Sequence, residues 1–295
     1  MSDIETKTHE ILRDSTFLRR LLTFEKERRG VAHDALVFVG MADVASHWWC
    51  TQKAVFTSRA NELSYFAAYL QDRLRYARRL NLLTQLPSTE GALLDVGKEV
   101  TLADVQKLLR EQEQEAQKDG KRSTRVEVTL EWRETVDRAG NRVRLINPNL
   151  PPWQRQLAEE TAAEKGVRVG DLEDDPKWRG EIYQKSRAEK HPTIRWNFPW
   201  CQYIVVGVPD GITNEFVYEY RTTRREGYLR NAKPGAFAQA DLYGFFFCRP
   251  KKRVQIHLVE ENDTRTWEEP VDRANAEGTL SAFARVDRGE PARPP

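Results

Sequence analysis

The amino-acid sequence predicts an α/β protein in which a mixed sheet is flanked by helices, with a helical N-terminal region and an accessory insertion. Two runs of β-branched and aromatic residues, 202–208 and 216–221, are separated by turn residues and predict paired strands. Apolar residues recur at helical spacing over 60–83. Helices and strands that alternate in this way are typical of a sheet covered by helices.

The first part of the chain predicts helices. Residues 7–30 have the pattern of a charged amphipathic helix, and 38–44 lead into another helix around 47–50. A long helix follows over 60–83. We therefore assign residues 1–84 to a helical N-terminal region.

The middle of the chain, residues 85–177, is predicted to be an accessory insertion. A mixture of Pro, Ser, Thr and Gly over 84–97 marks its start. Several elements are expected inside it: a helix from a capping box at 101–104 to about 118, a hairpin with strands at 125–134 and 143–145, a helix from 151 to 166, and an acidic link over 171–176.

Residues 178–295 are predicted to form the core. A helix over 178–191 is stopped by Pro192 and precedes the paired strands. The expected remainder is a helix starting at Lys233-Pro234, a strand over 254–258 and a helix over 271–283.

The second predicted strand carries charge on one face. Phe216, Tyr218 and Tyr220 share one side, whereas Glu219 and Arg221 lie on the other. Charges on a strand face usually indicate solvent, so a solvated hairpin in a structural protein is one interpretation. The other is that the charged face lines a cleft.

A turn at Asn214 places Asp210 opposite Tyr218 or Glu219. Opposed side chains of an antiparallel pair lie about 5 Å apart, so two carboxylates there repel each other unless a cation lies between them. The spacing therefore indicates a divalent metal site, unless Asp210 and Glu219 turn out to lie far apart.

Composition limits the class of protein. The chain has 47 Lys and Arg against 45 Asp and Glu, a net charge of +2, so it lacks the overall field of a polyanion binder. No apolar run approaches the roughly 18 residues of a membrane helix, and no export signal is visible, so we expect a cytoplasmic protein without a membrane partner. Three basic clusters are expected to be solvated: Arg73 to Arg79, Arg224-Arg225, and Lys251 to Arg253.

Three motifs in order resemble the RecB-like exonucleases associated with CRISPR systems, within the PD-(D/E)xK nuclease superfamily. They are Gly207-Val-Pro-Asp210, Glu219-Tyr-Arg221 and Gln239-Ala-Asp-Leu-Tyr243. The resemblance covers the last 118 residues well and the segment around Cys50 loosely. It implies a restriction-endonuclease-like fold, DNA as the partner, and association with CRISPR adaptation proteins.

The resemblance also implies a site. Asp210, Glu219 and the carbonyl of Tyr220 would hold Mg²⁺ or Mn²⁺ through hard oxygen ligands. Arg221 stands where the family has a lysine that orients water, and Gln239 and Tyr243 would support the site. Each of these two helix residues is also compatible with ordinary packing against the sheet.

Two departures favour a second interpretation, a nucleic-acid-binding or complex-forming module that cleaves weakly. Arg221 keeps the charge of the family lysine but not its shape, and it cannot lose a proton to act as a base. Tyr183 stands in the best match to the family's Gly-x-x-His helix, where it is a poor replacement for an imidazole ligand. Lys233 is a candidate replacement for the lysine.

The cysteines bear on an iron-sulfur cluster. Cys50, followed by Lys53-Ala54, resembles the first cluster ligand of the family, but the family's three C-terminal cysteines are absent. We therefore expect no [4Fe-4S] cluster on these residues. Cys201 and Cys248 are expected to be small buried apolar residues.

Overall fold

The computed structural model describes residues 12–30, 35–118, 132–136, 142–146, 152–174 and 193–292. The predicted helix over 178–191, Tyr183 within it, and residues 125–131 of the predicted strand over 125–134 lie outside these residues. The mixed α/β class is confirmed, but the strands of the expected central sheet form two separate mixed sheets.

The first sheet has the order β1-β5-β4 and is buried on both faces. Strand β1 (Val37–Gly40) runs parallel to β5 (Tyr203–Gly207), which pairs antiparallel with β4 (Trp196–Trp200). Because successive side chains point to opposite faces, Val39 and Val205 join one hydrophobic cluster and Phe38 and Ile204 join the other. Strands buried on both sides read as continuous apolar runs, as β1 and β5 do.

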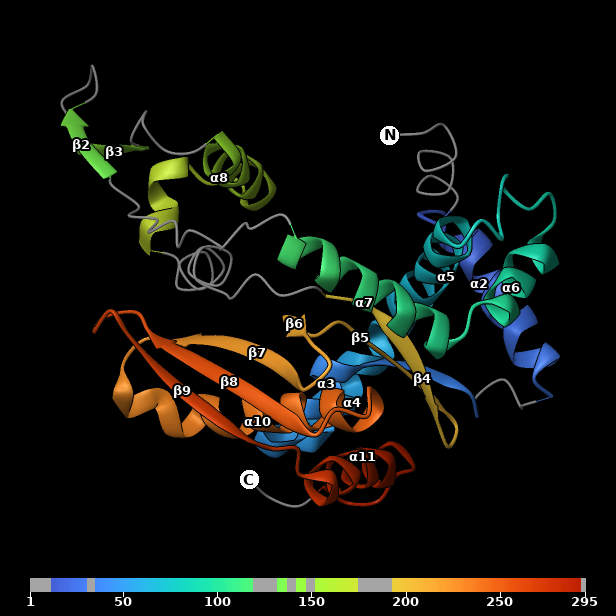
Figure 1. Cartoon of the computed structure of the whole chain (residues 1–295). Coiled ribbons are helices and arrows are strands. Elements are labelled where there is room, and N and C mark those ends of the chain that lie inside the picture. Colours follow the sequence, from blue (N-terminus) through green and yellow to red (C-terminus); the bar gives the residue numbers. More distant parts are fainter. Residues whose placement is uncertain are drawn as a thin grey trace.

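Helix α5 (Glu62–Arg79) packs on one side of this sheet, and α2 (Ser15–Arg28) and α6 (Glu90–Glu99) pack against α5 (Figure 1). Helix α2 begins after Asp14, whose carboxylate accepts hydrogen bonds from two main-chain N–H groups of the first turn. Thr89 caps α6 in the same way. The helix predicted over 60–83 is confirmed as α5.

Two shorter helices follow β1. Helix α3 (Met41–Ala45) leads into α4 (His47–Ala60), which is kinked at Cys50, where φ is −162° and ψ is 101°. The C-terminal helix α11 (Arg273–Asp287) packs against α4. Arg59 makes a bidentate contact with Asp287 at 2.7 and 2.8 Å, which joins the two helices.

The second sheet has the order β6-β7-β8-β9, formed by Gly211–Ile212, Phe216–Thr223, Lys251–Leu258 and Asp263–Pro270. Strands β7 and β8 are parallel, and the other pairs are antiparallel. Helix α10 (Leu229–Phe246) packs against β7 and β8 (Figure 1).

The predicted pairing of 202–208 with 216–221 is wrong. Strand β5 belongs to the first sheet, and the antiparallel partner of β7 is the two-residue strand β6. The predicted start of α10 at Lys233-Pro234 is also wrong. The helix begins at Leu229, so Pro234 lies inside it.

The elements of residues 85–177 largely follow the prediction. Thr101 and Asp104 exchange hydrogen bonds at the start of α7 (Leu102–Lys118), which confirms the capping box. The hairpin consists of β2 (Trp132–Val136) and β3 (Arg142–Ile146), and α8 (Pro152–Lys165) is followed by a 3-10 helix, Val169–Asp174.

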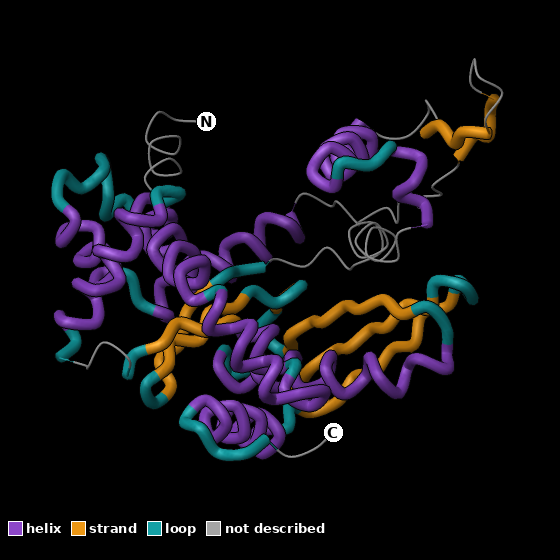
Figure 2. The backbone as a smooth tube through the Cα atoms, turned by 180° about the vertical axis from the view of Figure 1, so that it is seen from behind, coloured by secondary structure: helices purple, strands orange, loops and turns teal. Residues whose placement is uncertain are grey.

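Figure 1 and Figure 2 show β2, β3 and α8 away from the two sheets. Helices α6 and α7, in contrast, contribute side chains to the main hydrophobic clusters, among them Leu93, Leu94, Val105 and Leu109. The division of the chain at 84 and 177 stays a prediction.

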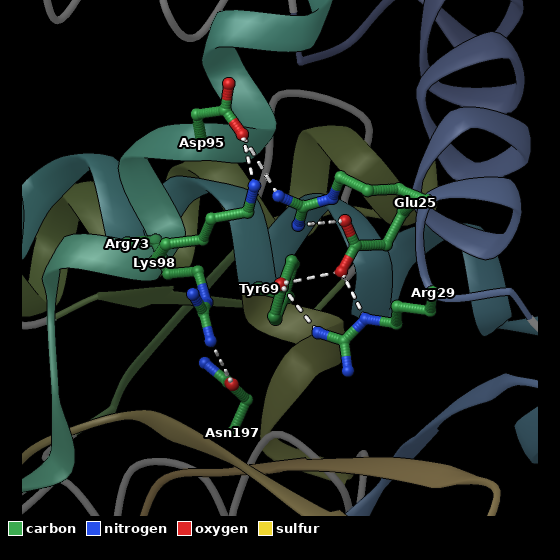
Figure 3. A network of polar contacts seen from close by, with 8 residues as sticks. Glu25, Arg29, Tyr69, Arg73, Asp95, Lys98 and Asn197 are labelled. Atoms are coloured by element: carbon green, nitrogen blue, oxygen red, sulfur yellow. Dashed lines mark hydrogen bonds and ion pairs between the residues drawn. The ribbon is translucent and has the colours of Figure 1, made fainter.

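A buried polar network ties α2 to α5 and β4 (Figure 3). Glu25 is fully buried and contacts Arg28 at 2.6 Å, Arg29 at 2.5 Å and the Tyr69 hydroxyl at 3.1 Å. Arg73 lies over the Tyr69 ring and donates to Asn197 at 3.2 Å. The expectation that Arg73 is solvated is therefore wrong, because its guanidinium is part of this packing.

Candidate functional site

Asp210 lies at the end of strand β6, beside β7. The register pairs Gly211 with Tyr218, so Asp210 is one step beyond this pair, on the level of Glu219. The Tyr220 main-chain N–H donates to Asp210 Oδ2 at 2.7 Å. The predicted placement of Asp210 opposite Tyr218 or Glu219 therefore agrees with the register.

Glu219 is a buried carboxylate in the middle of β7. Its residue exposure is 1%, so the alternative of a solvated hairpin is wrong for this side chain. Its Oε1 lies 2.7 Å from Arg221 Nε, and its Oε2 has no hydrogen-bond partner among the described residues. A carboxylate oxygen that is removed from water and has no hydrogen-bond partner lowers the stability of the folded protein.

Burial of Glu219 disfavours its ionised form. Burial raises the pKa of the Glu219 carboxyl to about 8; the guanidinium of Arg221 opposes this shift, and the charge of Asp210 adds to it. The two carboxylates therefore interact through space, and a cation near both would stabilise their charged forms.

A chain of contacts links Arg221 to helix α10. The Arg221 guanidinium donates to Gln239 Oε1, and Gln239 Nε2 donates to the Tyr243 hydroxyl at 3.4 Å. The Tyr243 hydroxyl in turn donates to the Val208 carbonyl at 2.7 Å. Gln239 and Tyr243 are four residues apart, so they lie on the same side of α10. From there Gln239 contacts Arg221 of β7, and Tyr243 contacts the main chain just after β5.

The ionisation states of Tyr243 and Arg221 agree with their roles as hydrogen-bond donors. Burial, and then the charges of Glu219 and Asp210, raise the pKa of the Tyr243 phenol, so Tyr243 remains a donor. The charge of Glu219 raises the pKa of the Arg221 guanidinium.

Gly207 lets Tyr243 approach the first sheet. A Cβ atom at Gly207 would lie 2.8 Å from Tyr243 Cε1 and 2.9 Å from Met41 Cβ. Contacts this short do not occur in folded proteins, so only glycine fits here without a shift of its neighbours. The first residue of the Gly-x-x-Asp motif thus sets the position of the last residue of the Gln-x-x-x-Tyr motif.

The oxygen atoms at this site fit a hard divalent cation. The register of β6 and β7 sets Asp210 level with Glu219, the Tyr220 main chain contacts Asp210, and one oxygen of Glu219 has no hydrogen-bond partner among the described residues. Oxygen ligands of this kind suit Mg²⁺ or Mn²⁺. Among the described residues, the site offers only two carboxylate side chains. No group of three or more His, Cys, Asp or Glu side chains arranged for a metal occurs within the described ranges.

Lys233 lies elsewhere on α10. Its ammonium is 4.9 Å from the centre of the Phe237 ring and 4.6 Å from that of the Trp267 ring. These cation–π contacts direct Lys233 toward β9, whereas the contacts of Arg221 are with Glu219 and Gln239.

The cysteines are free thiols in three different settings. Cys50 is partly buried at the kink of α4. The expectation that Cys201 and Cys248 are buried is wrong, because both are exposed and have positive φ values of 49° and 54°. Cys201 occupies the turn between β4 and β5, and Cys248 lies two residues after the end of α10, so both are in turns rather than in the core.

A further buried ion pair, which the sequence did not reveal, joins α10 to β8. Asp241 is two residues after Gln239 on α10 and contacts Lys252 of β8 at 2.6 Å. It also accepts from the main-chain N–H of Asp272 and from the side chain of Asn275, both at 2.8 Å. The expectation of a solvated Lys252 is wrong, since this pair fixes α10 against β8 and α11.

No family model and no curated protein matches the sequence. Among solved structures, the chain is similar to one described as the crystal structure of SSO0001, with 16% sequence identity and a TM-score of 0.30. The similarity covers 46% of this chain and 72% of that chain. Within the described ranges, no helix is both long and apolar enough to cross a membrane.

Proposed function

We propose that this protein is a metal-dependent deoxyribonuclease related to the RecB-like exonucleases of the PD-(D/E)xK superfamily. One observation carries the proposal. Residues from three separate motifs, Asp210, Glu219 with Arg221, and Gln239 with Tyr243, meet through contacts between β7, the end of β6 and α10.

Each residue has a role in this proposal. Asp210 and Glu219 would hold Mg²⁺ or Mn²⁺, together with the Tyr220 carbonyl. Such an ion, when bound, polarises a phosphate and lowers the pKa of its water. Arg221 supplies a positive charge for the phosphate oxygens, and its guanidinium suits phosphate geometry. Gln239 positions Arg221, and Tyr243 positions Gln239.

A restriction-endonuclease-like core would consist of the sheet β6-β7-β8-β9 with α10 packed on it, and the site would lie where β6 and β7 meet. A role in CRISPR adaptation or DNA repair rests on the motif resemblance alone.

The test is cleavage of end-labelled linear DNA by the purified protein with Mn²⁺ or Mg²⁺. The parent is expected to shorten the substrate, and Asp210→Ala and Glu219→Gln are expected to remove this activity. Glu268→Gln is the control, because Glu268 is an exposed carboxylate of the same sheet, paired with Arg253 at 3.1 Å. Equal cleavage by the parent and Glu219→Gln would contradict the proposal.

The second candidate function is a DNA-binding or complex-forming module that keeps the site but cleaves weakly. The ion pair between Arg221 and Glu219 favours it, because this pair already neutralises the buried carboxylate. Tight binding of DNA without metal-dependent cleavage by the parent would support this candidate.

A further inference from the structure

Arg221 is placed as a cation beside the buried carboxylate. Its Nε lies 2.7 Å from Glu219 Oε1, yet Nε makes no hydrogen bond within the described part of the chain. The contact is therefore a close charge pair without directed hydrogen-bond geometry. Since Glu219 is almost completely buried, the guanidinium is the positive charge that stabilises its ionised form.

The other end of the guanidinium is held from α10. Gln239 accepts from Arg221, Tyr243 accepts from Gln239, and the Val208 carbonyl accepts from Tyr243. Gln239 and Tyr243 are both buried. A flexible side chain is thereby kept next to Glu219.

We infer that Arg221 sets the metal affinity of this site by acting as an internal cation that competes with the divalent ion for Glu219. This inference rests on the proposed metal site and goes further, because it assigns Arg221 an effect on metal binding before any DNA is present. A guanidinium and a divalent ion repel each other at close range. Arginine stays protonated at all accessible pH values, so its guanidinium competes with the metal ion wherever Glu219 is ionised.

The Arg221 side chain has access to solvent, so its guanidinium is free to move away from Glu219. The Arg221 side chain is 42% exposed, whereas that of Glu219 is 2% exposed. When an ion binds Glu219, Arg221 moves toward solvent, and Gln239 loses its contact. The phosphate of a bound nucleic acid is a partner for the displaced guanidinium, so metal and nucleic acid are expected to bind cooperatively.

The experiment measures Mn²⁺ binding to the full chain without DNA, by titration calorimetry and by the electron paramagnetic resonance signal of free Mn²⁺. Arg221→Ala is expected to bind Mn²⁺ at least about tenfold more tightly than the parent, which corresponds to about 1.4 kcal/mol. Arg221→Gln, which keeps a polar side chain beside Gln239, is expected to do the same, and it serves as the second variant if Arg221→Ala does not fold. Mn²⁺ is also expected to raise the melting temperature of the Arg221 variants more than that of the parent.

Arg224→Ala is the matched control. It removes the same charge three residues further along the chain, where the side chain is 71% exposed and paired with Glu260. Its Mn²⁺ affinity is expected to equal that of the parent.

Two results would overturn the inference. One is an Mn²⁺ affinity of the Arg221 variants that is equal to or weaker than that of the parent, including the absence of binding by all of them. The other is an equal gain in Arg224→Ala, because a gain of that kind would be a general effect of net charge. Neither readout involves cleavage, so tighter binding by an inactive protein would uphold the inference while the proposed nuclease function fails.

Discussion

The guanidinium of Arg221 lies 2.7 Å from the carboxylate of Glu219, two residues before it on the same strand. Residues i and i+2 of a strand share a face, so β7 brings this acid and this base together without help from another element. Helix α10 then holds the pair through Gln239. The chemistry of the site depends on how firmly this pair is held.

Arg221→Lys is expected to accelerate metal-dependent cleavage of linear DNA while leaving DNA affinity nearly unchanged. An ammonium keeps the charge but is more compact than the planar guanidinium, so it leaves room for the attacking water beside Glu219. A misplacement of about 1 Å can change a rate on the order of a hundredfold. Single-turnover cleavage and a DNA-binding titration measure the two quantities.

The control for this prediction combines two changes. Glu219→Gln in the Arg221→Lys background is expected to abolish the gain in cleavage rate, because the carboxylate beside the new lysine is then lost. A gain that survives Glu219→Gln would show that the cleavage occurs elsewhere.

Gly207→Ala is expected to destabilise the protein by about 1–3 kcal/mol, because the new methyl group would overlap Tyr243 and Met41. Urea unfolding followed by circular dichroism measures the free energy of unfolding. Gly278→Ala in α11 is the matched control, since no atom lies within 4 Å of its added Cβ. It is expected to stabilise the protein by about 0.5–1 kcal/mol, because alanine is the better helix former. Equal effects at the two glycines would refute the close packing at Gly207.

Asp241→Ala is expected to lower the free energy of unfolding by about 3–5 kcal/mol, because it leaves the buried ammonium of Lys252 without its carboxylate. The exposed pair of Arg224 and Glu260 provides the comparison, and Arg224→Ala is expected to change stability by no more than about 1 kcal/mol. Denaturant unfolding of both variants measures the two changes in the free energy of unfolding. A loss in Asp241→Ala as small as that in Arg224→Ala would mean that the buried pair contributes nothing.

Protein purified without oxygen is expected to contain no stable [4Fe-4S] cluster. Cys50 lies at the kink of α4, and Cys201 and Cys248 lie in separate surface turns, so no four thiolates are supplied by this chain. Iron analysis and the visible absorption spectrum measure this. Stoichiometric iron whose absorption band disappears in Cys50→Ser would contradict the prediction.

The sequence predicted the local elements well where a single periodic pattern or cap decided them. The helix over 60–83 has a sustained apolar face, and Thr101 with Asp104 has a capping motif; both are present in the structure. The opposition of Asp210 and Glu219 also followed from local information, because the turn around Asn214 fixes the register of the strands beside it.

The pairing of strands over long distances was not predictable in the same way. Strand β5 pairs with β1, more than 160 residues earlier in the chain, and nothing in the run itself identifies that partner. Strand β9 was missed because its charged, exposed sequence lacks the alternation of a half-buried strand. The burial of Lys252 was also missed, since a lysine reads as solvated until its partner Asp241 is placed beside it.

The most direct test of the proposed metal site is the location of Mn²⁺ by anomalous X-ray scattering from crystals of the protein grown with the metal. We expect one anomalous peak in contact with the carboxylates of Asp210 and Glu219, with the guanidinium of Arg221 moved away from Glu219. Crystals of Glu219→Gln are expected to lack this peak. A parent crystal in saturating Mn²⁺ with Arg221 still paired to Glu219 and no peak beside the two carboxylates would show that these residues do not bind the metal.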